Sequence, residues 1–345
     1  MMCCGQCFQD NGLKKTISSE LSGENADCPT CGSKNVAIVD ASVLRDKFEF
    51  LIGIYTEDRN GQTLTEWLRE DWSLFEGGPL DIANANALLA EILDDGEIVR
   101  KKFIPSPQWQ SDKALVWQLL KEELKHKNRF FPKTELDADR LEALLSALLM
   151  DADSKPQEWY RARIEKEGRP YPLSKMGAPP PRLASHGRAN PAGVPYLYLA
   201  SKIETSISEV RPHPGETVCV AKFEIDEKLN LVDLRNPRKS ISPFDIEDEN
   251  QLGQLRGDIE FLENLGRELT VPVLPSSASI DYVPSQYLCE FIKKAGFDGV
   301  AYKSSMSSGM NIALFYVDKA VAKETSEHYI DAVSVSITVL EGNSD

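Results

Sequence analysis

The sequence predicts an α+β protein of three consecutive sections: a cysteine-rich segment at 1–39, a helical bundle at 40–152, and a domain of strands with flanking helices at 153–345. Three observations predict this order. Two cysteine pairs lie near the N-terminus, apolar residues then recur at helical spacing, and short β-branched and aromatic runs follow a proline-rich stretch. At 345 residues the chain is long enough for two or three domains.

Composition narrows the classes of function. With 41% hydrophobic and 27% charged residues, the chain has the composition of a folded protein. Its net charge is −15, and acidic residues outnumber basic ones in 1–40, 41–155 and 156–345 alike, so we do not expect nucleic acid as a partner. There is no run of about 18 apolar residues and no positively charged leader before an apolar run, so we expect a cytoplasmic protein without a membrane span.

The first section carries a candidate metal site. Cys4 and Cys7 form one C-x2-C pair, and Cys28 and Cys31 form a second pair after twenty intervening residues. Two residues between thiolates let both sulfurs reach one tetrahedral ion, and four ligands would close its coordination sphere. We therefore predict structural zinc. Two unrelated thiol pairs or a redox C-x-x-C are the alternatives, but no βαβ pattern surrounds either pair.

The second section shows the three-to-four-residue spacing of apolar positions that is typical of amphipathic helices. The stripes are Leu44, Phe48, Leu51, Ile52 and Tyr55; Leu80, Ala83, Ala87 and Ile92; Trp117, Leu120 and Leu124; and Leu136, Leu141, Leu144, Leu145, Leu148 and Leu149. They predict a small helical bundle. A basic run at 125–129 follows one apolar face, and we interpret it as a solvated helix end without chemistry of its own.

The third section begins near 152–157, where the helical pattern breaks and prolines become frequent. Runs rich in Val, Ile, Tyr and Phe predict strands at 195–200, 217–225, 230–234, 270–274, 299–302 and 311–317, with an edge strand at 333–340. Helices are expected at about 202–210 and 285–295. Neither glycine-rich phosphate-binding motif, G-x-G-x-x-G or G-x4-G-K-[ST], is present.

Polar residues of a particular set fall at the ends of these predicted elements. They are Arg161, Tyr198, Glu209, and Ser304 with Ser305. An arginine that holds phosphate, a carboxylate that stabilises oxocarbenium character, and an aromatic ring that stacks on a leaving base are what cleavage of an N-glycosidic bond needs. Taken alone, the same residues equally fit a surface ion pair, a solvated helix residue and a turn former.

The motifs around these residues resemble the RES domain family over about 156–320. They are Tyr160-Arg161-Ala162-Arg163, Gly187-Arg188-Ala189-Asn190-Pro191-Ala192-Gly193, Tyr196-Leu-Tyr198-Leu-Ala200, Glu204-Thr205-x-x-x-Glu209-Val210, Gly296-Phe-Asp-Gly299-Val-Ala-Tyr302-Lys-Ser304-Ser305, Gly309-x-Asn311 and Leu314-Phe315. The first 150 residues resemble the zinc-ribbon and HEPN-like extension that precedes some RES domains. HEPN ribonucleases have an arginine and a histidine separated by four to six residues, and no arginine lies at that distance before His126, so we expect a non-catalytic helical section.

The resemblance implies a fold similar to ADP-ribosyltransferases, with a split, bent antiparallel sheet, and an activity that degrades NAD+ by cleaving its nicotinamide–ribose bond. Water or inorganic phosphate would be the acceptor. RES proteins are typically toxins of bacterial toxin–antitoxin pairs, so an antitoxin or regulatory protein becomes an expected partner. Two alternatives stay open: a mono-ADP-ribosyltransferase that modifies a protein or nucleic acid, and an interaction protein with an inert RES-like domain.

The resemblance also implies roles for single residues. Arg161 would bind the pyrophosphate, Tyr198 would pack against nicotinamide or its ribose, and Glu209 would polarise the ribose hydroxyl and stabilise the cationic transition state. Ser304 would orient Glu209 or the ribose.

Three further positions are carried over as NAD+-binding candidates. Ser305 is a register alternative to Ser304, Arg188 is either a second phosphate ligand or a loop anchor, and Asn311 belongs to the Gly309-x-Asn311 motif.

Overall fold

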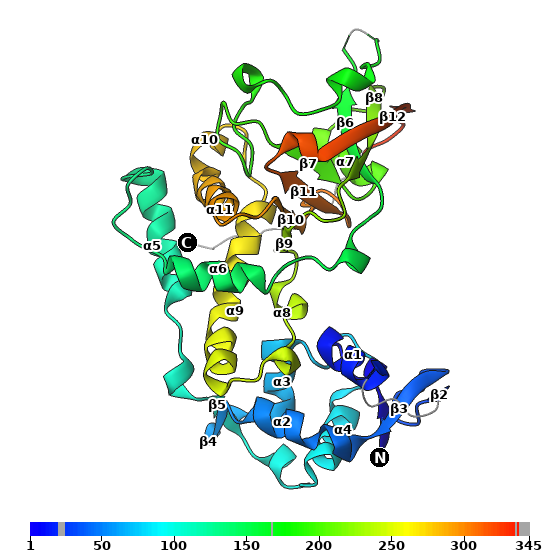
Figure 1. The fold of residues 1–345 in the computed structure, drawn as a ribbon, viewed down its shortest axis with the longest axis vertical. Helices are drawn as coiled ribbons and strands as arrows, with labels where there is room; N and C mark the ends of the chain where they lie inside the picture. Colours follow the sequence, from blue (N-terminus) through cyan, green and yellow to red (C-terminus); the bar gives the residue numbers. More distant parts are fainter. Residues whose placement is uncertain (20–24, 167, 335–336, 338–345) are drawn as a thin grey trace. The chain divides into compact units, whose positions relative to one another are not determined.

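The computed structural model describes residues 1–19, 25–166, 168–334 and 337. They form two compact units (Figure 1). The N-terminal unit is Met1–Leu148 with Asn236–Arg267, and the C-terminal unit is Leu149–Arg235 with Glu268–Asp345. The division differs from the three sections expected from the sequence, because residues 236–267 of the third section belong with the N-terminal unit.

The cysteine-rich segment is a small three-stranded antiparallel sheet with one helix beside it. Its strands are β1 (Met2–Cys4), β2 (Asn25–Ala26) and β3 (Val36–Asp40), in the order β1-β3-β2, and α1 spans Asn11–Ser19. The β1–β3 register runs from Met2 opposite Asp40 to Cys4 opposite Ile38. This pairing places Cys4 at the end of β1, beside the turn that carries the second cysteine pair.

The rest of the N-terminal unit is mainly helical, as the apolar spacing predicts. Its helices are α2 (Arg45–Ile52), α3 (Leu64–Trp72), α4 (Ile82–Leu93), α5 (Lys113–His126), α6 (Ala138–Ser146), α8 (Pro237–Ser240) and most of α9 (Glu249–Thr270). Thr63 and Glu66 form a capping box at the start of α3, and Asp81 caps α4. The likeness of this section to HEPN-like extensions stays a prediction.

Two expectations from the sequence are wrong. The first apolar stripe does not continue as a helix to Tyr55, because α2 ends at Ile52 and Tyr55 begins the strand β4 (Tyr55–Gln62), which pairs with β5 (Phe103–Pro105). The strand predicted at 270–274 is also absent, since Thr270 is the last residue of α9. The sequence interpretation missed this 22-residue helix.

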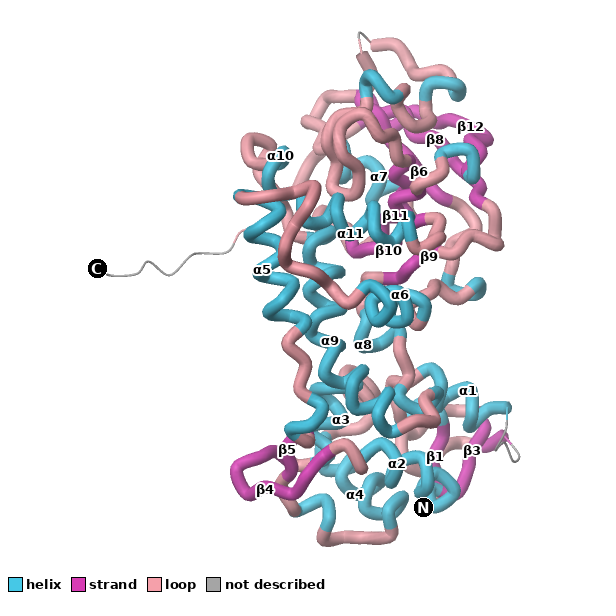
Figure 2. The backbone as a smooth tube through the Cα atoms, turned by 60° about the vertical axis from the view of Figure 1, so that its left-hand side comes forward, coloured by secondary structure: helices cyan, strands magenta, loops and turns pink. Residues whose placement is uncertain are grey.

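The C-terminal unit is built on a seven-stranded sheet with the order β12-β8-β6-β7-β11-β10-β9, whose strands are the magenta segments at the top of Figure 2. The strands are β6 (Trp159–Ile164), β7 (Leu197–Ala200), β8 (Thr217–Ile225), β9 (Leu231–Asp233), β10 (Gly299–Lys303), β11 (Met310–Leu314) and β12 (Ala320–Tyr329). All neighbours are antiparallel except β9 and β10, which are parallel, so the sheet is mixed rather than wholly antiparallel. β6 and β12 were not predicted, and the edge strand expected at 333–340 falls mostly outside the described residues.

The sheet opens between β6 and β7. These strands share a single registered pair, Tyr160 with Ala200, whereas β6 and β8 are paired at six successive positions. Helix α7 (Ile203–Val210) packs beside this opening through apolar residues of its inner face, and α10 (Ala278–Asp281) and α11 (Val283–Lys294) follow later in the chain. The other face of the sheet packs into a core around Trp159, Phe223 and Ile312. An opened sheet leaves space for a cavity beside β6 and α7.

Across the described ranges, no helix is both long and apolar enough to cross a membrane.

Candidate functional site

A cavity of about 310 Å³ lies at the opening between β6 and β7. Its lining includes side chains from β6, β7, α7, β10, β11 and the loop before β7, namely Arg161, Tyr198, Glu209, Tyr302, Asn311 and Arg188. Five of these six are residues that the sequence singled out, although they are spread over 150 positions of the chain. The fold therefore gathers the predicted set around one space.

Glu209 is held by two donors on one of its carboxylate oxygens. The hydroxyl of Ser304 and the side-chain amide of Asn311 each donate a hydrogen bond of 2.7 Å to Oε1 of Glu209. Ser304 Oγ in turn accepts from the backbone N–H of Met306 at 3.1 Å, so the turn after β10 fixes the hydroxyl. The second oxygen of Glu209 has no hydrogen-bond partner among the described residues. A carboxylate with one oxygen held and one open can accept a hydrogen bond from a bound ligand.

Arg161 is desolvated and incompletely paired. Its Nη1 donates to the carbonyl oxygen of Tyr198 at 3.1 Å, across the opening of the sheet, and its Nε is buried without a partner among the described residues. Burial, with a smaller contribution from Arg163, lowers the pKa of Arg161 to about 10, so the guanidinium stays charged at neutral pH. A half-buried cation with one neutral partner among the described residues is a strong binding group for an anion.

Tyr198 organises the loop that closes one side of the cavity. Its hydroxyl donates to Oδ1 of Asn190 at 2.7 Å and accepts from the N–H of Ala189 at 3.0 Å. Burial raises the pKa of Tyr198, so the hydroxyl remains protonated as a donor. A Cβ at Gly187 would collide with the Asn190 amide oxygen and the Tyr198 hydroxyl, and this close approach explains the glycine. The sequence motif contained Asn190, but nothing in it indicated that this side chain pairs with Tyr198.

Arg188 is anchored by the protein itself. Its Nη1 donates to the carbonyl oxygens of Val271 at 2.5 Å and Leu269 at 3.4 Å, Nη2 donates to Ser305 Oγ at 3.2 Å, and the guanidinium lies 5.6 Å from the ring centre of Tyr282. These contacts are those of a loop anchor, one of the two interpretations left open by the sequence. Ser305 contacts Arg188, whereas its neighbour Ser304 contacts Glu209.

Tyr302 is a cavity residue that sequence reasoning missed. It lies on β10 opposite Asn311, is only 4% exposed, and lines the cavity. Burial raises the pKa of its hydroxyl well above the ordinary value. Tyr302 lies among small and apolar residues, so the sequence makes it look like a core residue. The only signal that could have identified it is that alternate residues of a strand face opposite sides of the sheet.

Comparison with known proteins identifies the family to which the C-terminal part of the chain is similar. A family model of the RES domain matches residues 158–335, just over half of the chain. The chain belongs to the RES domain family. Among solved structures, this chain is similar to the crystal structure of the M. tuberculosis MbcT–MbcA toxin–antitoxin complex, with 12% identity, a TM-score of 0.32, and coverage of 56% of this chain and 93% of that chain. The comparison with curated proteins finds no match.

The candidate metal centre lies outside the matched RES domain. The sulfurs of Cys4, Cys7, Cys28 and Cys31 all lie within 4.8 Å of one another, with 3.5 Å between Cys4 and Cys31 and 3.7 Å between Cys7 and Cys28. Tetrahedral bonds of 2.3 Å place two sulfurs about 3.8 Å apart, so the cluster fits a four-thiolate ion. Gly32, at φ +77°, donates its N–H to the Cys28 carbonyl oxygen at 2.9 Å and closes the turn that presents the second pair.

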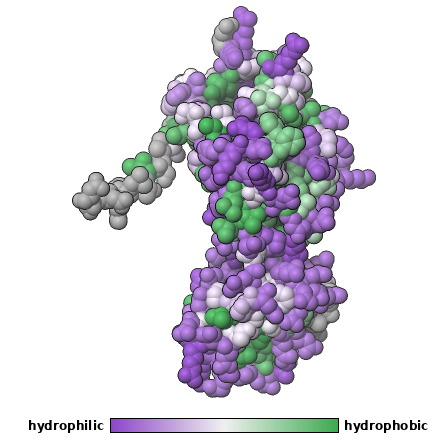
Figure 3. Space-filling model, turned by 90° about the vertical axis from the view of Figure 1, so that its left-hand side faces the viewer, coloured by the Kyte–Doolittle hydropathy of each residue, from purple (hydrophilic) through white to green (hydrophobic). Residues whose placement is uncertain are grey.

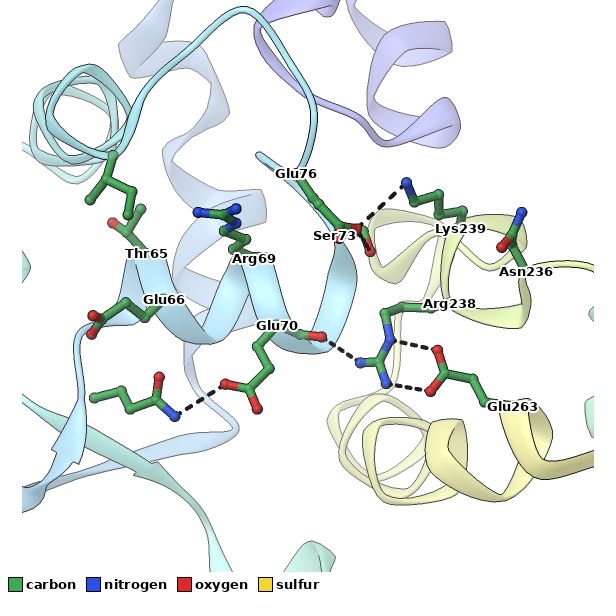
Figure 4. A pocket seen from close by; sticks show the side chains of 12 residues that line it. Thr65, Glu66, Arg69, Glu70, Ser73, Glu76, Asn236, Arg238, Lys239 and Glu263 are labelled. Atoms are coloured by element: carbon green, nitrogen blue, oxygen red, sulfur yellow. Dashed lines mark hydrogen bonds and ion pairs between the residues drawn. The ribbon is translucent and has the colours of Figure 1, made fainter. Parts of the chain in front are cut away.

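A second, larger cavity of about 690 Å³ lies in the N-terminal unit between α3, α8 and α9 (Figure 4). Its charged groups are largely paired. Arg238 forms two bonds of 2.9 Å with Glu263 and also donates to the carbonyl oxygens of Glu70 and Asp71 at 2.6 and 2.9 Å. Lys239 lies 3.5 Å from Glu76. These contacts join α8 and α9 to the end of α3, and they leave Arg238 no donor group without a partner.

Proposed function

We propose that the RES domain of this chain binds NAD+ and cleaves the N-glycosidic bond between nicotinamide and ribose. The single observation that carries the proposal is the state of Glu209 at the cavity, whose Oε1 is fixed by Ser304 and Asn311 while its second oxygen has no partner in the part of the chain that the structure describes. A fixed carboxylate beside an anion-binding arginine suits a reaction that develops positive charge on a sugar next to a pyrophosphate. The family resemblance supports the same substrate.

In the proposed mechanism Arg161 binds the pyrophosphate, which supplies the negative charge that its half-buried guanidinium lacks among the described residues. Tyr198 lies beneath the nicotinamide end, with its ring lining the cavity and its hydroxyl engaged in the loop. Glu209 accepts a hydrogen bond from a ribose hydroxyl through its open oxygen and stabilises the oxocarbenium-like transition state. Nicotinamide departs as a neutral molecule, so the site needs no general acid.

Water or inorganic phosphate is the proposed acceptor, giving ADP-ribose or its 1-phosphate. The protein would then act as a toxin or defence effector that depletes NAD+ and is held in check by an antitoxin or regulatory protein. In the N-terminal unit, Cys4, Cys7, Cys28 and Cys31 would hold a structural zinc ion, since four thiolates leave no open position for catalysis.

The test is nicotinamide release from NAD+ by the purified full-length chain, followed by chromatography. Glu209→Gln keeps the size of the side chain and removes its charge, so we expect the rate to fall by about 10²–10³-fold. Glu204→Gln is the matched control, because Glu204 is an exposed residue of the same helix. Equal rates for Glu209→Gln and the wild type, or no nicotinamide release by the wild type, would refute the proposal.

Product analysis with radiolabelled NAD+ identifies the acceptor. ADP-ribose 1-phosphate that appears only with added phosphate indicates phosphorolysis, and free ADP-ribose in both conditions indicates hydrolysis. Label retained on protein or nucleic acid would instead identify the mono-ADP-ribosyltransferase alternative.

A further inference from the structure

The loop after α5 presents two phenylalanines to solvent. Phe130 and Phe131 are each 82% exposed, which makes them the most exposed aromatic side chains among the described residues. Single apolar residues on a surface are common, but two adjacent aromatic rings with almost no contact to their own protein are typical of an interaction site. Figure 3 shows that apolar side chains gather in a few patches on an otherwise hydrophilic face.

The protein holds this loop in place. The carboxylate of Glu123, which is only 9% exposed, accepts hydrogen bonds from the N–H groups of Lys133 at 2.7 Å and Thr134 at 2.9 Å. Asn128 closes the loop from the other side, since its amide donates to the carbonyl oxygen of Phe131 and accepts from the N–H of the same residue. The two rings are therefore presented by an ordered loop, which lowers the entropic cost of binding.

The charge of the loop contrasts with that of the chain. Residues 125–133 contain Lys125, Lys127, Arg129 and Lys133 and no acidic residue, although the whole chain has a net charge of −15. The partner must combine an apolar space for aromatic rings with acidic side chains around it.

The N-terminal unit itself carries a surface of this kind. A recess of about 500 Å³ between α3 and α4 is lined by apolar residues, chiefly Phe75, Leu80, Ile82, Ala83 and Ala85. Ile82 is 48% exposed at this recess. The charged residues of the recess itself are Arg69 and Asp81. The recess shares Thr65, Arg69 and Ile82 with the larger cavity of Figure 4, where Glu66 and Glu70 of α3 are exposed and Glu76 is paired with Lys239.

We propose that this chain self-associates through its N-terminal unit, with the loop that carries Phe130 and Phe131 entering the α3–α4 recess of a second copy. The rings would be buried against Phe75 and Ile82, and the basic flanks of the loop would meet Glu66 and Glu70. Arg69 would stack on a buried ring. A nucleic acid or an anionic membrane fits less well, because an extended polyanion meets the net negative charge of the whole chain, whereas the recess is an apolar space whose neighbouring cavity carries the discrete acidic groups Glu66 and Glu70.

The first test is the molar mass of the full-length chain by light scattering, from about 1 to about 100 µM, the range in which micromolar association is visible. We expect the wild type to reach at least twice the 38.5 kDa of one chain. The double substitution Phe130→Ser and Phe131→Ser should weaken association by more than about tenfold, as loss of two buried aromatic anchors does. Leu183→Ser is the control, because Leu183 is 74% exposed in the C-terminal unit and should leave the mass unchanged.

The second test addresses the recess. Ile82→Arg places a positive charge where the basic loop is expected to bind, so this variant alone should also be a single chain. A mixture of Ile82→Arg with the Phe130/Phe131 double variant should associate again, since one copy supplies an intact loop and the other an intact recess. Light scattering of the mixture measures this rescue directly.

Three results would overturn the proposal. One is a wild type with the mass of one chain at about 100 µM, and another is a Phe130/Phe131 variant that associates as the wild type does. The third is a monomeric wild type that binds fluorescein-labelled oligouridylate or phosphatidylglycerol vesicles in a Phe130-dependent manner, because that result would assign the loop to a polyanion.

Discussion

The cavities of the two units each contain an arginine, Arg238 and Arg161, and these two arginines differ in how the protein pairs them. Arg238, in the larger N-terminal cavity, has a bidentate carboxylate and two carbonyl oxygens as partners. Arg161, in the smaller C-terminal cavity, has one carbonyl oxygen, a buried Nε without a partner among the described residues, and a lowered pKa. The N-terminal cavity has a volume of about 690 Å³ and the C-terminal cavity about 310 Å³. Selecting a candidate site by volume alone would therefore choose the cavity whose arginine is already paired.

This difference separates structural from functional polar groups. A buried charge that the protein pairs fully stabilises the arrangement of its own helices, whereas a desolvated charge left unpaired is a cost that a ligand can remove. The same holds for carboxylates. Arg238 contacts both oxygens of Glu263, whereas only one oxygen of Glu209 has a hydrogen-bond partner within the described ranges.

The largest expected effect concerns stability and the candidate metal centre, a four-cysteine cluster that only the N-terminal unit contains among the described residues. Cys7→Ser should lose the bound metal and lower the thermal transition of the N-terminal unit, because structural zinc contributes on the order of 10 kcal/mol to the folding of small domains. Cys3→Ser is the matched control, since Cys3 is buried nearby but lies outside the cluster. Metal analysis and calorimetry measure both effects, and equal metal content in Cys7→Ser and Cys3→Ser would contradict the assignment.

The next largest effect is on enzymatic activity, which should distinguish Arg161 from Arg238. Arg161→Met removes the proposed pyrophosphate ligand, and we expect kcat/KM for NAD+ to fall by about 10²–10³-fold, roughly 3–4 kcal/mol. Arg238→Met should retain activity within about twofold, because its guanidinium is occupied by the protein. Steady-state nicotinamide release decides between these outcomes, and equal losses in the two variants would remove the distinction drawn between the cavities.

The free energy of unfolding should show the opposite order, with Arg238→Met more harmful than Arg161→Met. Arg238→Met leaves the carboxylate of Glu263 and two backbone carbonyl oxygens without their donor, and we expect it to lower the free energy of unfolding by about 2–4 kcal/mol. Urea unfolding monitored by circular dichroism measures the change. Arg69→Met is the control on the same cavity, since Arg69 is exposed, and a change as large as that for Arg238 would argue against pairing as the cause.

A smaller effect is expected for the two residues that position Glu209. Ser304→Ala and Asn311→Ala each remove one of two donors to the same oxygen, so each should lower kcat about tenfold, about 1.4 kcal/mol, with little change in KM. Ser305→Ala is the neighbouring control, because its hydroxyl accepts from Arg188 and does not contact Glu209. A rise in KM at constant kcat would indicate that these residues bind NAD+ rather than position the carboxylate.

Features that depend on residues close together in the sequence could be predicted, whereas contacts between residues far apart in the sequence mostly could not. The four cysteines are encoded by local spacing, and their sulfurs do lie together. The pairing of Ser304 and Asn311 with Glu209 joins residues about 100 positions apart. The motifs of the RES family pointed to the pairing of Ser304 with Glu209, whereas Asn311 was expected to bind NAD+ and its bond to Glu209 was not predicted. No local pattern indicated that Arg188 would be anchored by Leu269 and Val271 at the end of a helix that had itself been missed.

The missed elements have physical reasons as well. Helix α9 contains Gly253 and Gly257, which lower helix propensity, but a Cβ at either position would collide with Trp109 or its backbone, so close packing requires them. Strand β12 is an exposed edge strand rich in charged residues, so it lacks the apolar alternation by which strands are recognised.

The smallest predicted effect discriminates best, because it is a gain in the free energy of unfolding, whereas most substitutions of buried groups lower it. Arg161→Met should raise the free energy of unfolding of the ligand-free protein by about 1 kcal/mol, since methionine fills similar space without an unpaired, desolvated charge. The lost bond to the Tyr198 carbonyl oxygen offsets part of this gain. Urea unfolding of the same samples used for kinetics measures it. A variant that is inactive and more stable identifies Arg161 as a group retained for a ligand, whereas an inactive variant destabilised as strongly as Arg238→Met would show that Arg161 serves the fold.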